Sequence, residues 1–259
     1  MSSHGVHPAA AVGFDQAAEA YVRGRPDYPE DAVRFLVGTL RLEPGRRVLD
    51  LAAGTGKLTR LLVPSGAEVV AVEPVEGMRS ALAAEVEGVE IMDGRAEAIP
   101  LPDGSLDAAV VAQAFHWFDG PAALAELHRV LRPGSVLALV WNVRDDERSA
   151  FWARLTEALE PFRGDTPSHR STAWARAFDR PELFTPLRTR AFVWEHATTR
   201  EGAVDRVLSI SFVAAMPEDE RAGVRDEVLR LLDQDPQIGP RSDRFGLPYR
   251  TDVQWCTRR

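Results

Sequence analysis

Short apolar runs alternate with amphipathic stretches across residues 46–142 of this 259-residue chain. Short runs of four or five mostly apolar residues are typical of strands buried on both faces, and such strands usually pair in parallel. The runs lie at residues 48–51, 69–72, 89–92, 108–111 and 136–140. Segments with the spacing of one helical face, such as residues 76–87 and 121–131, lie between them. This alternation predicts an α/β fold with a doubly wound, mostly parallel sheet.

The segments on either side of this core follow other patterns. Residues 14–23 and 31–42 predict two N-terminal helices. After the core, the regular alternation stops and large aromatic residues become frequent. The later segments are an aromatic-rich stretch at 143–185, a strand at 188–197, two helical stretches at 200–215 and 217–234, and a last strand at 251–257. They predict a helical cap packed on the core.

Composition narrows the class of protein. The chain is 45% hydrophobic and 27% charged, which excludes collagen-like, mucin-like and intrinsically disordered proteins. Cys256 is the single cysteine, so an internal disulfide and a cysteine-based zinc site are excluded. No apolar run approaches the length of a membrane span, and residues 1–13 do not resemble a signal peptide. The net charge of −8 argues against nucleic acid as a partner. We therefore expect a soluble, cytoplasmic protein with neither a nucleic-acid nor a membrane partner.

A glycine-containing turn follows the first predicted strand, at residues 50–57. Such a turn lets a ligand approach the backbone closely. A phosphate-binding P-loop is excluded, because leucine occupies positions 51 and 58, where that loop needs glycine and Ser or Thr. A nicotinamide-binding turn fits poorly, because its third glycine would be Thr59.

Two acidic residues favour a different ligand. Asp50 at the start of the turn would repel a pyrophosphate but suits a ligand with an ammonium group, and S-adenosylmethionine has a sulfonium, an ammonium and no phosphate. Glu73 ends the second predicted strand, where a carboxylate accepts hydrogen bonds from ribose hydroxyls. Taken singly, each feature is compatible with a plain tight turn or a solvated strand end. Together they favour S-adenosylmethionine over a nicotinamide cofactor.

Residues 48–56, with sequence VLDLAAGTG, resemble motif I of class I S-adenosylmethionine-dependent methyltransferases. Ala52 replaces the first glycine of the family pattern. Residues 94–102 resemble the adenine-contacting loop, although Arg95 stands where the family often has aspartate, so Glu97 or the backbone of Ala96 would make that contact. The chain thus resembles the methyltransferase type 11 domain. Residues 21–29, 113–119 and 247–251 resemble a subgroup near the trans-aconitate methyltransferases.

The resemblance implies a Rossmann-like methyltransferase fold: a doubly wound, mostly parallel seven-stranded sheet with N-terminal helices and a C-terminal helical cap. Its last strand would lie antiparallel beside the fifth. We expect a single domain made of N-terminal helices (1–45), a cofactor-binding core (46–142), a cap with substrate-side elements and strand six (143–250), and the last strand (251–259).

The resemblance and the turn together imply a set of cofactor-binding residues. An arginine at position 25 would hold the methionine carboxylate in a forked geometry. Met78 would pack against the adenine ring, or serve as an ordinary core residue. The full set is Tyr21, Arg25, Asp50, Ala52, Gly54, Thr55, Gly56, Glu73, Pro74, Met78, Ala96, Glu97 and Gln113.

Catalytic and acceptor-binding candidates follow the fourth predicted strand, since ligands of doubly wound folds sit outside the carboxyl ends of the strands. His116 is the candidate base, because an imidazole titrates near neutral pH. Its alternative role is structural, as a helix cap or a donor to a carbonyl. Phe115 and Trp117 are candidates for binding the acceptor. The histidines lack metal-ligand spacing and residues 145–147 fit the start of a helix, so we expect no metal.

These features predict S-adenosylmethionine-dependent methyl transfer to a small organic acceptor. An oxygen nucleophile is favoured over nitrogen, and a carboxylate is one candidate that needs no base. Two alternatives stay open: a protein of this fold that binds the cofactor without transferring its methyl group, and an NAD(P)-dependent oxidoreductase. We expect a monomer or a homodimer.

Overall fold

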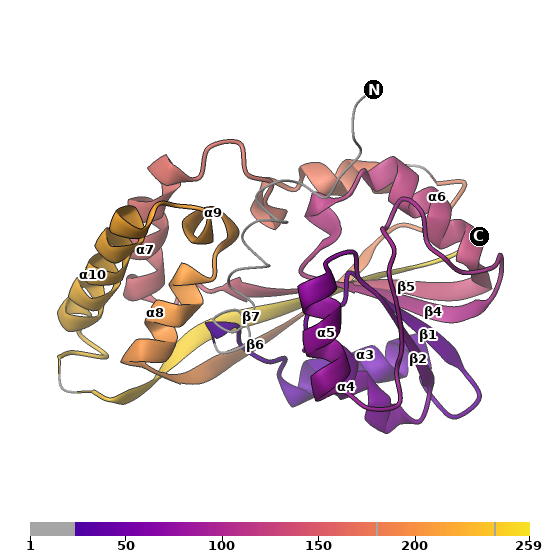
Figure 1. The fold of residues 1–259 in the computed structure, drawn as a ribbon, viewed down its shortest axis with the longest axis horizontal. Helices are drawn as coiled ribbons and strands as arrows, with labels where there is room; N and C mark the ends of the chain where they lie inside the picture. Colours follow the sequence, from indigo (N-terminus) through magenta and orange to yellow (C-terminus); the bar gives the residue numbers. More distant parts are fainter. Residues whose placement is uncertain (1–23, 180, 241) are drawn as a thin grey trace. The chain divides into compact units, whose positions relative to one another are not determined.

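The computed structural model describes residues 24–259 except 180 and 241. The helix predicted at 14–23 and the candidate Tyr21 lie outside the described residues. The strands are β1 (Arg47–Leu51), β2 (Glu68–Val72), β3 (Glu90–Met92), β4 (Leu106–Ala112), β5 (Leu131–Arg144), β6 (Arg188–Thr199) and β7 (Arg244–Thr257). The α-helices are α3 (Glu30–Leu40), α4 (Thr59–Leu62), α5 (Glu76–Glu85), α6 (Gly120–Val130), α7 (Ala150–Leu159), α8 (Arg200–Leu208), α9 (Ser211–Ala214) and α10 (Glu218–Gln234). Short 3₁₀ turns complete them, at η1 (Val63–Ser65), η2 (Phe115–Trp117), η3 (Glu160–Phe162), η4 (His169–Ser171) and η5 (Ala173–Phe178) (Figure 1).

The strands form one sheet in the order β3-β2-β1-β4-β5-β7-β6. The pairs β2–β3, β1–β2, β1–β4 and β4–β5 are parallel. β7 lies beside β5 and runs in the opposite direction, because Arg258 is hydrogen-bonded to Gly134 and Ser135 near the start of β5, and Pro248 accepts from Asp145 just after its end. The doubly wound, mostly parallel seven-stranded sheet predicted from the sequence is therefore confirmed, including its antiparallel last strand.

The chain divides into two compact units, and each is described separately. Unit 1 comprises described residues 24–26, 142–166 and 193–250, and unit 2 comprises 27–141, 167–192 and 251–259. The chain passes from one unit to the other within β5, β6 and β7.

The core of unit 2 consists of apolar side chains from its strands and from the helices beside them. α3 buries Ala32, Leu36 and Leu40, which recur every four residues and so form one stripe along the helix. This stripe belongs to the same cluster as Val48 of β1 and Val110 of β4, both fully buried. The continuous apolar runs of the central strands are explained by this burial, since β1, β2 and β4 have neighbours on both sides.

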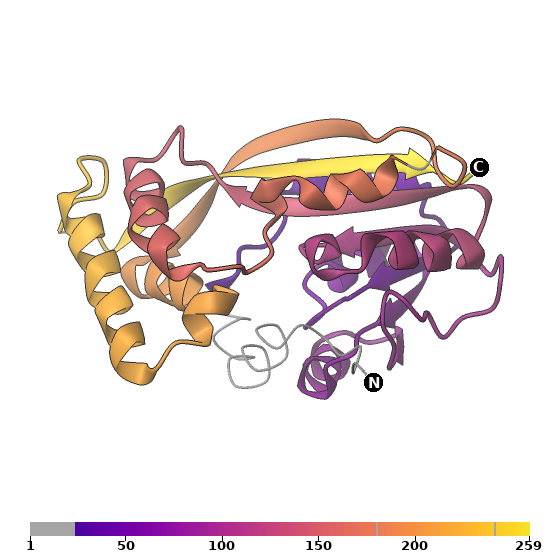
Figure 2. The ribbon, with the colours of Figure 1, turned by 90° about the horizontal axis from the view of Figure 1, so that it is seen from above.

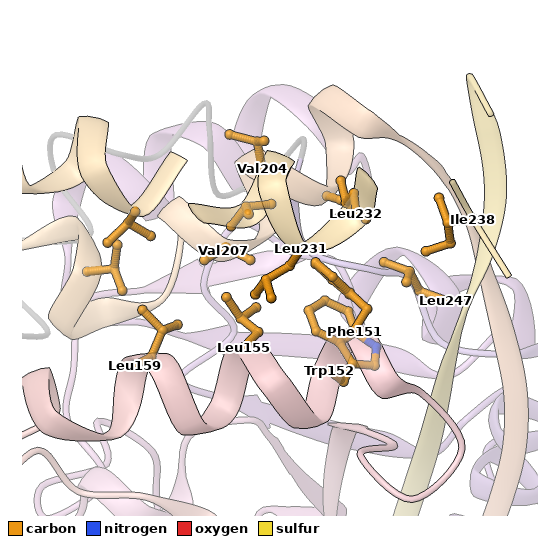
Figure 3. Packing of buried hydrophobic residues seen from close by; sticks show 14 of the residues in the cluster. Phe151, Trp152, Leu155, Leu159, Val204, Val207, Leu231, Leu232, Ile238 and Leu247 are labelled. Atoms are coloured by element: carbon orange, nitrogen blue, oxygen red, sulfur yellow. The ribbon is translucent and has the colours of Figure 1, made fainter. Parts of the chain in front are cut away.

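Unit 1 has a core of its own, formed mainly by α7, α8 and α10, which gather at one place (Figure 2). Trp152 and Leu155 of α7 point toward Val207 of α8 and Leu231 of α10 (Figure 3). The indole N–H of Trp152 donates to the carbonyl of Pro248 at 3.1 Å, which fixes β7 against this helix. The C-terminal helical elements expected from the sequence are thus organised around one apolar cluster.

Several predicted boundaries were wrong. β5 begins at Leu131 and not at 136, and it includes Gly134, which adopts a φ of +80°. β7 begins at Arg244 and not at 251, and it includes Pro248, whose carbonyl accepts hydrogen bonds from the indole N–H of Trp152 and the backbone N–H of Asp145. The helical stretch at 200–215 is divided into α8 and α9 around Ser209 and Ile210.

No helix within the described residues combines the length and the apolarity needed to cross a membrane.

Gly56 is the tightest point in the packing of unit 2 around the turn after β1. Its φ is +82°, and a Cβ added there would lie 2.9 Å from Cγ of Leu82 and 3.1 Å from a methyl of Val86. Gly88 has a φ of +74° but no heavy atom within 4 Å of an added Cβ. The two positions therefore separate backbone strain from steric overlap.

We predict that Gly56→Ala lowers the free energy of unfolding by about 2–4 kcal/mol, because strain and overpacking add. Gly88→Ala should cost about 1–2 kcal/mol, because it carries the backbone strain alone. Urea denaturation followed by circular dichroism measures both. Equal losses for the two variants would contradict the packing role of Gly56.

Candidate functional site

The turn between β1 and α4 departs sharply from regular geometry. Ala52, Gly54 and Gly56 adopt φ values of +56°, +58° and +82°, in the left-handed region that disfavours side chains. Ala52 is held there because its N–H donates to the carbonyl of Val72, at 2.7 Å, at the end of β2. A strained residue that is held by a cross-strand hydrogen bond is typical of a functional site.

Asp50 lies at the carboxyl end of β1 with no exposure to solvent. One carboxylate oxygen, Oδ2, accepts from the hydroxyl of Thr59 at 2.7 Å. The other, Oδ1, has no hydrogen-bond partner among the described residues. The pKa of Asp50 is raised to about 7, mainly by burial; the hydrogen bond from Thr59 opposes the shift, and the nearby negative charge of Glu73 adds to it. The turn thus starts at a buried acid with one unsatisfied oxygen.

Glu73 comes directly after β2 and is 4% exposed. Its carboxylate is fixed by two backbone donors: Gly54 N–H at 2.9 Å to Oε2 and Val75 N–H at 3.0 Å to Oε1. Burial raises the pKa of Glu73, and these two hydrogen bonds oppose the shift. The bond from Gly54 ties Glu73 to the turn that follows Asp50, so the two acids predicted from the sequence are brought to one place.

Other predicted residues of the turn region surround these acids. Thr55 is 5% exposed, and its hydroxyl has no hydrogen-bond partner in the part of the chain that the structure describes. Met78 on α5 is 3% exposed, with its sulfur 3.8 Å from the position of a Cβ at Gly54. Pro74, between Glu73 and α5, is half-buried. Two orphaned polar groups, on Asp50 and Thr55, are unusual in a folded core and point to a bound ligand.

The loop predicted to contact adenine lies after β3. Ala96 is 4% exposed, and the half-buried Glu97 accepts the N–H of Asp119 at 3.0 Å. Asp119 in turn caps α6 by accepting the N–H of Ala122. The Glu97 carboxylate therefore fixes the start of α6 in this structure.

Gln113 follows β4 and repeats the geometry of Ala52. Its φ is +61°, and its N–H donates to the carbonyl of Val140, at 2.8 Å, on β5. Two non-glycine residues with left-handed backbones thus follow two neighbouring strands of the sheet, each bonded to the next strand. This is the edge at which doubly wound folds bind ligands.

An aromatic cluster occupies the segment after Gln113. Its members are Phe115, His116, Trp117, Trp141, His169, Trp174 and Phe178. The rings of His116 and Trp117 lie 5.1 Å apart, and those of His116 and His169 lie 6.3 Å apart. Phe115 is fully buried and packs 5.2 Å from Phe178. The predicted acceptor-side residues therefore belong to one set of packed rings.

Trp141, His169 and Trp174 were not among the predicted site residues. Trp141 is 2% exposed and lies 4.5 Å from the ring of Trp174, and its indole N–H has no hydrogen-bond partner in the described part of the chain. Trp141 follows Val140, the residue bonded to Gln113, so it stands at the same sheet edge. The only sequence signal was the richness of residues 143–185 in aromatics, which includes Trp174 but not Trp141.

Arg25 falls in unit 1 and is described there. Its guanidinium donates to the carbonyl of Ser209 at 3.1 Å, at the C-terminal end of α8. The structure therefore ties Arg25 to a helix terminus, where a positive charge is favourable. Within the described residues, no group of three or more His, Cys, Asp or Glu is arranged to hold a metal ion.

Comparison with known proteins gives a consistent result. A family model described as a methyltransferase domain matches residues 49–139. An uncharacterized methyltransferase of Mycobacterium tuberculosis is 40% identical over 248 residues, which cover 96% of this chain and 95% of that relative. A malonyl-[acyl-carrier protein] O-methyltransferase of Serratia marcescens is 34% identical over 199 residues, covering 70% of this chain and 76% of the relative.

Solved structures share the architecture. A structure from Anaeromyxobacter dehalogenans, provisionally named a type II methyltransferase, is 28% identical with a TM-score of 0.64, and covers 90% of this chain and 96% of its own. The YcgJ protein of Bacillus subtilis, at 19% identity and a TM-score of 0.58, shows the same fold, covering 89% of this chain and 99% of its own.

We predict that the free protein loses stability as the pH rises from about 4 to about 7, because of Asp50. The folded-state pKa, about 7, exceeds the unfolded value near 4, so the folded protein binds the proton more tightly. The stabilisation is complete below the unfolded pKa and is lost as the pH rises through the folded one. The loss is on the order of a few kcal/mol.

Urea denaturation of the wild type and of Asp50→Asn between pH 4 and 8 gives the free energy of unfolding of each as a function of pH. The effect of Asp50 is the difference between these two pH dependences. Asp226→Asn removes an exposed carboxylate on α10 and supplies the control. A wild-type curve parallel to that of Asp50→Asn would show that Asp50 ionises normally.

Proposed function

Because this chain belongs to the methyltransferase family, we propose that it transfers the methyl group of S-adenosylmethionine to an oxygen atom of a small organic acceptor. The observation that carries the proposal is the pair of buried carboxylates, Asp50 and Glu73, joined through the turn at Gly54. Such a pair repels phosphates and suits a ligand that brings positive charge and hydroxyl donors.

The orphaned groups of the turn fit the amino-acid end of this cofactor. Asp50 Oδ1 is buried without a partner, and a carboxylate in that state is stabilised by a nearby cation or donor. An ammonium group supplies both. The Thr55 hydroxyl, also buried without a partner in the described chain, offers a further donor and acceptor.

Glu73 fits the ribose. Each of its oxygens accepts one backbone N–H, and a carboxylate oxygen has capacity for a second donor. The two backbone bonds fix the carboxylate in advance, so little conformational entropy is lost when hydroxyls bind. Met78 beside the turn supplies an apolar contact for the base.

The cofactor supplies a methyl group already activated by the sulfonium. The protein must hold a nucleophile in line with it and exclude water, which is mainly a matter of positioning. The aromatic cluster is suited to excluding water, since Phe115 and Trp141 are almost fully buried. His116 lies within this cluster and is the side chain best placed to take a proton.

An oxygen acceptor is supported by the O-methyltransferase of Serratia marcescens among the relatives. A carboxylate is a nucleophile without losing a proton, so it requires no base, whereas a phenol or an ammonium does. The function of His116 therefore depends on the acceptor. The relatives named above are methyltransferases and give no support to an oxidoreductase. A protein that binds the cofactor without transferring its methyl group is distinguished from a methyltransferase by analysis of the products.

We predict that the protein binds S-adenosylmethionine and S-adenosylhomocysteine with micromolar affinity and binds NAD far more weakly. Glu73→Ala should weaken binding of the first two by at least tenfold, because two hydroxyls lose a charged acceptor, each worth about 1.5–3 kcal/mol. Titration calorimetry measures the affinities. Glu76→Ala, which removes an exposed carboxylate three residues later, is the matched control. Preference for NAD, or equal affinities for both variants, would contradict the proposed cofactor.

We predict a small effect of His116→Asn if the acceptor is a carboxylate: kcat falls by less than about tenfold, because no base is needed. For an acceptor that must lose a proton, the fall should reach about 10²–10⁴-fold, and the rise of kcat with pH should disappear. Formation of S-adenosylhomocysteine against a panel of organic acids, phenols and amines measures both. His128→Asn, on α6 outside the aromatic cluster, is the control. If no acceptor yields S-adenosylhomocysteine although the cofactor binds, the protein does not transfer methyl groups.

A further inference from the structure

Arg206 is a buried cation in unit 1. It lies on α8, whose neighbouring residues Val204 and Val207 point into the apolar cluster of this unit (Figure 3). Its exposed fraction is 7%. A guanidinium remains protonated in proteins, so the charge is buried with it. Buried charges normally have a counterion or a complete set of hydrogen bonds.

In the described structure, Arg206 has neither a counterion nor a complete set of hydrogen bonds. Nε donates to the phenol oxygen of Tyr249 at 3.1 Å, and that phenol is neutral and fully buried. Nη1 is buried and has no hydrogen-bond partner within residues 24–259 other than 180 and 241. In the same residues, no carboxylate forms an ion pair with Arg206. The site therefore holds an uncompensated positive charge and an unused donor.

A second arginine is held beside the same helix end. A Cβ at Gly24 would lie 2.7 Å from the backbone nitrogen of Arg206, so the chain at residue 24 runs directly against α8. The next residue, Arg25, donates to the carbonyl of Ser209, just after α8 ends. Two guanidinium groups and the acidic residue Asp205 therefore lie in this short region.

We propose that Arg206 binds a small anion, a carboxylate or a phosphate, through Nη1. Tyr249 is a positioning residue, because it holds the Nε edge of the guanidinium and leaves Nη1 for the ligand. Arginine is suited to this task because its planar donors match the oxygens of both anions.

Small anions are the direct probes of this site. We expect acetate, malonate or inorganic phosphate, added at constant ionic strength against chloride, to raise the Tm of the wild type in a saturable manner. Saturation by the carboxylates alone, or by phosphate alone, identifies the anionic group. Arg206→Met should raise the half-saturating concentration at least tenfold. Arg225→Gln, which removes an exposed positive charge on α10, should behave like the wild type. Equal half-saturating concentrations for the wild type and Arg206→Met, or no saturable shift of Tm in the wild type, would overturn the proposal.

The free variants test whether Arg206 is merely structural. Arg206→Met removes a buried charge but also leaves the buried hydroxyl of Tyr249 without its donor, so the Tm of the free protein should fall no further than in Tyr249→Phe. A larger fall in Arg206→Met would mean that Nη1 already has a structural partner, and would overturn the proposal. Tyr249→Phe keeps the ring in place and removes its oxygen, and should weaken anion binding several-fold; an unchanged affinity would contradict the positioning role. If Arg206→Met does not fold, the anion affinity of Tyr249→Phe still tests the proposal.

Titration with S-adenosylmethionine separates this proposal from the proposed function. Arg206→Met should keep the wild-type affinity for the cofactor. Loss of that affinity in Arg206→Met would assign the guanidinium to the carboxylate of the cofactor instead and overturn the proposal. A wild-type protein that binds the anion but not the cofactor would contradict only the proposed function.

Discussion

The burial of Asp50 is the constraint on which the geometry of the site depends. Asp50 lies near the carboxyl end of β1, a central strand between β2 and β4, and its side chain has no contact with water. A carboxylate there is stable only if neighbouring groups serve it, yet the structure supplies only the Thr59 hydroxyl and adds the charge of Glu73 nearby. The folded chain therefore contains a local electrostatic cost, and a cationic ligand would relieve it.

The backbone near Asp50 and Glu73 carries conformational strain. Ala52 and Gln113 have left-handed backbones without being glycine, and each is held by one hydrogen bond to a neighbouring strand. The same turn requires a glycine at 56, because α5 packs against it. Strain at two strand ends, with dense packing behind one of them, keeps the backbone N–H groups and the Glu73 carboxylate in a fixed arrangement. A site built in this way is preorganised before any ligand arrives.

Much of this arrangement could be predicted from the sequence, because the signals are local. Continuous apolar runs identify strands buried on both faces, and the position of Glu73 directly after the second run was enough to place it beside the turn. The length of β7 was underestimated because glycine and proline, here Gly246 and Pro248, usually end a strand. The hydrogen bonds that the Pro248 carbonyl accepts come from residues about a hundred positions earlier. Arg206 could not be recognised, since its burial depends on Tyr249, 43 residues later in the sequence. Trp141 resembled one more apolar residue of β5.

The distribution of these features suggests which part of the chain determines the reaction and which part determines the acceptor. The family model matches residues 49–139, which lie wholly within unit 2 and contain Asp50, Glu73 and the turn. Under the proposed function, these residues bind the cofactor, whatever the protein methylates. Trp141, His169, Trp174 and Arg206 all lie outside that match. Because the reaction at the sulfonium demands little beyond alignment, the selectivity for one acceptor has to come from groups that recognise the rest of the molecule. The indole N–H of Trp141, which has no partner among the described residues, is a candidate for such a group. A buried donor without a partner discriminates strongly, since an acceptor that lacks the matching oxygen leaves it unsatisfied.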